Sequence, residues 1–230
     1  REVGDTETEI HALNNLGTAL ATAGDLIEGQ ARLTQSLDLA LARDAHEHAA
    51  RAFTNLGSTN VINWSLADAD RHLHAGITYC ADRDLDTWRL YMTAWLARSL
   101  AEQGRYDAAE RHVADVTRRP HVSPITQVSV LPVAGVLAAR RDRDGTRELD
   151  EALAIAVRTG EALRLIPVTA ACAEAFWIAG RTSDLIAAVD RAWPVAVEHP
   201  HPWGLGELSW WLRLAGDGRR VGGPTQNQTT

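Results

Sequence analysis

HALNNLGTALATAGD (residues 11–25) and RAFTNLGSTNVINWS (residues 51–65) decide the fold, because the second stretch repeats the first after 40 positions. The triplet NLG at residues 15–17 returns at residues 55–57. Apolar residues in both stretches recur at intervals of three and four positions, which is the spacing of a helix. A repeat at such a period, roughly 35 to 41 residues along the chain, predicts stacked helix–turn–helix units.

Similar units are predicted along the rest of the chain. A second helix is expected after each of the two stretches, over residues 26–42 and 66–81, and a third unit over residues 89–116. Proline is absent from residues 1–119, so nothing interrupts long helices there. Further turns are predicted at Gly104, between Asp142 and Gly145, at Gly180 and at Gly216. We therefore expect an all-α protein, an α-α superhelix of about five to six helical hairpins.

Small residues stand where two helices of one unit must approach closely. In the first three units they are Gly17, Gly29 and Ser36, then Gly57, Ala69 and Gly76, then Ala97 and Ala109. Gly24 and Gly104 are the glycines expected at the turns of the first and third units. The large packing residue of each unit is Leu33, Leu73 or Val113. This pattern resembles the tetratricopeptide repeat, and the resemblance implies a solenoid over residues 1–216. An irregular helical bundle is the alternative, and the polar, glycine-rich residues 217–230 are expected to form a disordered tail.

The second half of the chain is less regular. Ser123 before Pro124 predicts the start of a helix, with proline in its first turn. The last helix is expected over residues 205–216, after a loop at residues 199–204. Pro132 is expected to kink the helix that contains it, and Pro167 to bend or restart another. Pro194 falls in the second helix of the same unit as Pro167.

A more specific resemblance involves residues 103–113, 148–181 and 201–216. These segments are similar to the C-terminal helical region of large ATP-binding regulators of the LuxR type, and of related bacterial signalling ATPases. The matching positions are Arg164, Pro167, Val168, Glu174, Trp177, Gly180, Pro202, Trp203, Gly206, Glu207, Leu208 and Trp211. The resemblance implies a parent protein with a nucleotide-binding domain before this region and often a DNA-binding helix-turn-helix after it. The chain begins with Arg1 rather than Met and contains no GxxxxGK[ST] motif, so we expect it to be a fragment of such a protein.

Composition excludes several classes of function. The net charge of −7 argues against direct nucleic-acid binding, which depends on clustered basic residues. No apolar run reaches the ~18 residues of a membrane span, and no signal peptide is present, so a cytoplasmic location is expected. Cys80 and Cys172 fall on apolar helix faces, which predicts buried thiols in a reducing compartment rather than a disulfide.

Signatures of catalysis and of metal binding are weak, and we expect no enzyme activity, cofactor or metal site. Three His-x-His pairs occur, but residues two apart on a helix point in different directions. Residues 82–86 imitate the start of a calcium loop but lack its glycine and its final glutamate, so Asp86 is expected to cap the next helix instead. Glu174 is either a general base or, as we prefer, a buried carboxylate bonded to an arginine such as Arg164.

The first helix of each unit is expected to line the concave face of the superhelix. Counting back from each turn gives these candidate ligand-binding positions: His11, Asn14, Thr18, Arg51, Thr54, Ser58, Tyr91, Arg98, Glu174, Trp177, Trp203, Trp210 and Arg213. The tryptophans have two interpretations, as anchors in the groove or as packing between the repeats.

Three functions are compatible with this surface. The preferred hypothesis is a non-catalytic regulatory module of a LuxR-type regulator or signalling ATPase, which senses an inducer or docks a partner in its groove. The partner would be a protein, a peptide or another domain of the parent chain. The first alternative is a stand-alone scaffold that binds peptides, and a remote one is an enzyme built on a helical solenoid with Glu174 in its site.

Overall fold

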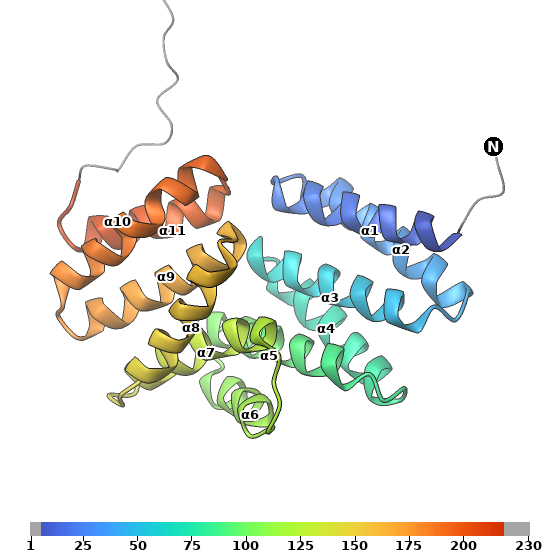
Figure 1. Cartoon of the computed structure of the whole chain (residues 1–230), viewed down its shortest axis with the longest axis horizontal. Coiled ribbons are helices and arrows are strands. Elements are labelled where there is room, and N and C mark those ends of the chain that lie inside the picture. The colour runs from blue at the N-terminus through green and yellow to red at the C-terminus, as the bar shows by residue number, and fades with distance from the viewer. Residues whose placement is uncertain (1–5, 219–230) are drawn as a thin grey trace, which may run out of the picture.

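A computed structural model describes residues 6–218, and within that range the chain forms eleven α-helices and no strand. The helices alternate between two layers (Figure 1). The inner layer consists of α1 (Thr6–Thr22), α3 (His46–Ile62), α5 (Asp86–Glu102), α7 (Pro124–Ala139), α9 (Ala162–Ile178) and α11 (Pro202–Leu214). The outer layer consists of α2 (Leu26–Ala42), α4 (Leu66–Ala81), α6 (Tyr106–Thr117), α8 (Thr146–Thr159) and α10 (Thr182–Glu198).

The packing between helices follows the order of the chain. Each inner helix packs against the next inner helix, and each outer helix packs against the inner helices before and after it. Five hairpins and a final helix therefore follow one another around an arc (Figure 1), which confirms the predicted α-α superhelix. The predicted tail falls almost wholly outside the described residues.

The predicted close approaches between paired helices are present. A Cβ atom on Gly17 of α1 would lie 2.7 Å from the carbonyl oxygen of Gly29 and 2.8 Å from Cγ of Leu33 on α2. Leu33 and its counterpart Leu73 are fully buried, as expected for the large packing residues. Ser36 is also buried and donates a hydrogen bond to the carbonyl oxygen of Ile10 (2.8 Å), so even this small polar residue ties the two helices together.

The turns that end the inner helices share a left-handed backbone conformation. Gly24, Gly104 and Gly180 have φ angles of 100°, 74° and 69°. In the second hairpin the same position is held by Trp64, with a φ angle of 61°. A side chain at such a φ angle is strained, whereas glycine is not. The second turn therefore keeps a bulky residue at a cost in backbone energy.

Two expectations about helix starts met different outcomes. Ser123 caps α7 as predicted, because its side chain accepts a hydrogen bond from the backbone N–H of Thr126. Asp86 does not cap α5. The cap residue is Leu85, which has no side-chain acceptor, and the Asp86 carboxylate instead accepts a hydrogen bond from Nε of Arg89 (2.9 Å).

The prolines do not break the later helices. α7, α9 and α10 each continue as one helix through Pro132, Pro167 and Pro194 respectively, so the predicted restart at Pro167 is wrong. α11 begins at Pro202, three residues earlier than expected, because proline suits the first turn of a helix and the side chain of His201 provides the cap.

The two cysteines are buried and unpaired. Burial raises the pKa of Cys80 to about 11 and that of Cys172 to about 12, so both remain as unreactive thiols at neutral pH. No helix in the described range, residues 6–218, is both long and apolar enough to cross a membrane.

Candidate functional site

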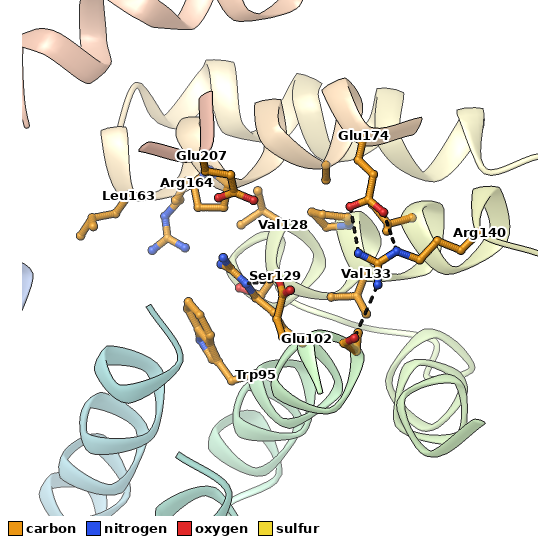
Figure 2. Close-up of a pocket in the computed structure, with 16 residues that line it drawn as sticks. Trp95, Glu102, Val128, Ser129, Val133, Arg140, Leu163, Arg164, Glu174 and Glu207 are labelled. Carbon is orange, nitrogen blue, oxygen red and sulfur yellow. Dashed lines mark hydrogen bonds and ion pairs between the residues drawn. The ribbon is translucent and has the colours of Figure 1, made fainter. Parts of the chain in front are cut away.

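A chamber lies on the inner layer between α5, α7, α9 and α11 (Figure 2). It holds about 750 Å³ of space free of atoms, including the part open to solvent. We call it the central chamber. Its walls are formed by Trp95, Val128, Ser129, Pro132, Val133, Val136, Leu163, Pro167 and Ala171 and by the charged residues Arg98, Glu102, Arg140, Arg164, Glu174 and Glu207.

The repeat brings these residues to one place. The position nine residues before each turn is Trp95 in α5, Val133 in α7, Ala171 in α9 and Glu207 in α11, and all four line the chamber. Positions two and six residues before the turns complete the same stripe, because residues three and four apart share one face of a helix. In α5, α7 and α9 this stripe thus faces the central chamber, whereas Ser58 of α3 and Trp210 of α11, six residues before their turns, do not line it.

One wall of the chamber is closed by an ion pair between α7 and α9. Arg140 donates from Nε to Oε1 of Glu174 (2.5 Å) and from Nη2 to Oε2 (2.9 Å), as Figure 2 shows. The guanidinium also lies 5.3 Å from the centre of the Tyr106 ring. The preferred interpretation of Glu174 as an arginine-bonded carboxylate is confirmed, but its partner is not Arg164, which donates to Glu161 instead (2.6 Å).

Two other charged groups in the chamber have no comparable partner. The carboxylate of Glu207 makes no hydrogen bond to any described residue. Burial raises its pKa to about 7, helped by the negative charges of Glu102 and Glu174 and opposed by Arg98. Arg98 makes only a long contact to Glu102, with Nε 3.9 Å from Oε1, and lies 5.7 Å from the Trp95 ring centre. Opposite charges therefore remain available inside the chamber.

A second space adjoins the central chamber and shares four of its residues. We call it the tryptophan chamber. It holds about 420 Å³, again including the part open to solvent. Its lining residues are Ile62, Trp64, Arg98, Ala162, Leu163, Ile166, Pro167, His201, Trp203, Gly204 and Glu207. The strained Trp64 of the second hairpin meets Trp203 of α11 here, with ring centres 6.2 Å apart.

His201 carries an unused donor at the edge of the tryptophan chamber. Its Nδ1 accepts a hydrogen bond from the backbone N–H of Gly204 (3.4 Å), so a neutral ring must carry its hydrogen on Nε2. Burial lowers the pKa of His201, which keeps the ring neutral. Nε2 is buried and has no partner among the described residues.

The two ends of the superhelix come close together. A third space, lined by residues of α1 and α3 on one side and by α9 and the segment between α10 and α11 on the other, holds about 1140 Å³ including its open part. Figure 1 shows these elements facing each other across the opening of the arc. The arc is therefore almost closed around its interior.

The structure brings together only some of the candidate ligand-binding residues. Arg98 and Glu174 line the central chamber, Trp203 lines the tryptophan chamber, and Thr18 lines the space between the two ends. The remaining candidates that are not buried lie outside these three spaces: His11, Arg51, Tyr91, Trp177, Trp210 and Arg213.

Three candidates are buried between inner helices, so their assignment to the groove surface needs correction. Thr54 and Ser58 of α3 bond to carbonyl oxygens of their own helix. Asn14 of α1 accepts a hydrogen bond from Nδ2 of Asn55 (2.6 Å). These side chains satisfy backbone and neighbouring polar groups within the inner layer, and none is placed to touch a ligand in the groove.

The sequence interpretation missed several residues that line the chambers. Glu102 and Arg140 both stand two positions before a turn, and Glu207 stands nine positions before one. Trp64 had its own signal, since a tryptophan replaces the turn glycine found at Gly24 and Gly104. No feature of the sequence indicates that His201 lines a chamber, because its position depends on how the ends of the superhelix meet.

No protein-family model matches this chain, and no curated protein matches it in sequence.

Proposed function

We propose that the chain is a non-catalytic recognition module that binds a small inducer or a segment of a partner protein in its central chamber. Through the resemblance described above, we place it within a LuxR-type ATP-binding regulator or a related bacterial signalling ATPase of the cytoplasm. The observation that carries the proposal is the position of the chamber, which is formed by four consecutive inner helices at once.

A ligand in this chamber would be coupled to the shape of the superhelix. Each repeat contacts mainly its neighbours, so the curvature of the array depends on small shifts between successive hairpins. A ligand that contacts α5, α7, α9 and α11 favours the curvature in which all four contacts are made. Attached domains would then sense occupancy as a change in the spacing of the two ends.

The catalytic alternative loses the residue on which it was based. Both carboxylate oxygens of Glu174 accept hydrogen bonds from Arg140, so the group that was considered as a general base is already engaged. A stand-alone peptide-binding scaffold remains the second candidate, since the open side of the arc also suits an extended segment.

Blocking the chamber tests the proposal. Ser129→Trp fills the chamber, whereas Ser183→Trp adds the same side chain to an exposed position of α10. We expect an inducer or partner found by screening for a rise in melting temperature to stabilise the wild type and the Ser183 variant, but not the Ser129 variant. A screen in which every binder stabilises both variants equally contradicts the proposal, and turnover of a bound compound favours an enzyme.

The parent protein can be tested separately. An upstream reading frame that encodes a nucleotide-binding motif supports the regulator, and an inducer should then change its ATP hydrolysis. A reading frame without such a motif supports the stand-alone scaffold.

A further inference from the structure

The central chamber has balanced charges, which restricts what can fill it. Three arginines and three glutamates line it, and two of these residues, Arg140 and Glu174, neutralise each other through a two-point ion pair. Arg164 is paired with Glu161 at the rim. Arg98, Glu102 and Glu207 remain, so the chamber still presents charges of both signs. A ligand that carries both a negative and a positive group can be matched to them.

Arg98 and Glu207 are the two groups that a ligand would engage. They line both chambers, yet they form no ion pair with each other and no hydrogen bond with any residue in the described range. Arg98 presents unused N–H donors suited to a carboxylate, and Glu207 presents two oxygens suited to an ammonium group. A molecule that carries both groups would bridge this gap.

Trp95 forms part of the chamber wall next to Arg98. It is nine-tenths buried, and its indole N–H has no partner among the described residues. Figure 2 shows the ring at the lower side of the chamber, across from Arg164 and Glu207. The indole nitrogen is enclosed by protein atoms, so a ligand in the chamber would contact other parts of the Trp95 ring.

The tryptophan chamber supplies a place for an apolar group next to these charges. Trp64, Ile166 and Trp203 form its walls, and Leu163 lies between the two chambers. Trp64 is held in a left-handed conformation where the neighbouring hairpins use glycine.

We propose that the ligand is a small zwitterion with an apolar side group, which is the chemistry of a hydrophobic α-amino acid. Its carboxylate binds Arg98, its ammonium group binds Glu207, and its side group fills the tryptophan chamber. This assignment rests on the proposed function, because it names the ligand class of the same site.

Binding should depend on pH. Glu207 must be ionised to hold an ammonium group, and with a pKa of about 7 it is mostly protonated at pH 6 and mostly ionised at pH 8. We expect affinity to rise roughly tenfold between these values. The other titratable or charged residues around the chambers are Arg98, Glu102, Arg140, Arg164, Glu174 and His201. Of these, His201 is kept neutral by burial, which lowers its pKa.

Calorimetric titration of the wild-type chain with L-leucine, L-phenylalanine and L-tryptophan tests the assignment. We expect at least one to bind, and its carboxamide and its N-acetyl derivative to bind at least about tenfold more weakly, because each lacks one charge. Arg98→Gln and Glu207→Gln should each weaken binding by a similar factor. The exposed variants Arg158→Gln and Glu9→Gln should leave the affinity unchanged.

The possible failures are distinguishable. A derivative that binds as tightly as the parent amino acid overturns the zwitterion assignment. The zwitterion assignment is also overturned if no amino acid binds while another compound binds the wild type but not the Ser129→Trp variant. In that case the proposed recognition function still stands. If no compound or partner distinguishes the Ser129 and Ser183 variants, the proposed function fails together with this assignment.

Discussion

At the scale of single residues, Trp64 trades backbone strain for a contact across the superhelix. Its left-handed conformation costs about 1–2 kcal/mol relative to glycine, and its ring contact with Trp203 contributes about 0.5–1.5 kcal/mol. These terms nearly cancel. We therefore expect Trp64→Gly to change the free energy of unfolding by less than about 1 kcal/mol, as measured by urea denaturation, while ligand affinity falls.

The first hairpin offers the matched control for Trp64. Gly24 has a φ angle of 100°, and a Cβ atom there would meet nothing within 4 Å, so only backbone strain counts. Gly24→Ala should lower stability by about 1 kcal/mol. A large loss of stability in Trp64→Gly, with affinity unchanged, would show that Trp64 serves packing alone.

Glu207 gives the protein a pH dependence of known sign. Its pKa is raised from 4.5 to about 7 in the folded chain, so the folded state binds more protons than the unfolded state between these values. Stability therefore falls as the pH rises from about 4.5 to about 7 and then levels off, by on the order of 2 kcal/mol for a partly exposed group.

The Glu207→Gln variant should lose this dependence. We expect it to match the wild type near pH 4.5 and to exceed it in stability at pH 8, as measured by urea unfolding at both values. The exposed Glu9→Gln variant should keep the wild-type pH profile. If the Gln variant is less stable than the wild type at pH 8, then the carboxylate is held by interactions that outweigh its burial.

The site residues were only partly predictable, because the predicted stripe agrees with the face that lines the chamber six residues before a turn, as at Arg98 and Glu174, but is offset from it by one position one helical turn closer to the N-terminus. Positions ten residues before the turns, Asn14 and Thr54, were chosen as groove residues, but these are buried between the inner helices. Positions nine residues before the turns, such as Trp95 and Glu207, face the inside. One residue rotates a side chain by about 100° around a helix, which is enough to move it from a ligand surface into a helix contact.

At the scale of the helix pair, the approach of α1 to α2 depends on Gly17. A Cβ atom there would lie 2.7 Å from a backbone oxygen of α2, which cannot move away as a flexible side chain can. We expect Gly17→Ala to lower the free energy of unfolding by about 1–3 kcal/mol, as measured by thermal or urea unfolding. The whole hairpin would have to separate slightly to accept one methyl group.

Gly206 provides the opposite case within α11. It is exposed, and a Cβ atom there meets nothing within 4 Å. Gly206→Ala should raise stability by about 0.5–1 kcal/mol, since alanine favours the helix over glycine. If Gly17→Ala raised the free energy of unfolding as Gly206→Ala does, helix propensity rather than the close approach would dominate at Gly17.

Helical hairpins were predictable because the same pattern of small and large residues recurs in several repeats. Small residues such as Gly17 and Gly57 recur with large partners such as Leu33 and Leu73, and the periodicity predicts both the helices and their pairing. The ends of helices were less predictable. Their caps depend on single side chains, and α11 starts earlier than expected because His201 supplies an acceptor that composition alone does not indicate.

At the scale of the whole molecule, the spacing of the two ends depends on a few side chains. The inner helices pack in sequence from α1 to α11, and the second hairpin meets α11 through the rings of Trp64 and Trp203. An array of this kind opens or closes through small shifts at each interface. The contact between the two rings is therefore positioned to hold the arc closed around its chambers.

Spin labels across the opening measure this closure. Ala23→Cys and Glu198→Cys place labels on opposite sides of the space between the ends, and both positions are exposed. The native Cys80 and Cys172 are buried with raised pKa values, so they do not compete for the label. The distance distribution between the two labels then reports how widely the arc opens.

We expect Trp203→Ala to broaden this distribution and shift it to longer distances, because it removes the only ring that Trp64 meets within the described residues. Trp210→Ala is the matched control, since Trp210 is 55% exposed, is carried by the same helix and lies outside all three spaces. Identical distributions in the two variants would show that the stacked inner helices alone fix the curvature. The ends would then be unable to report a ligand, and the coupling of the chambers to attached domains would need another route.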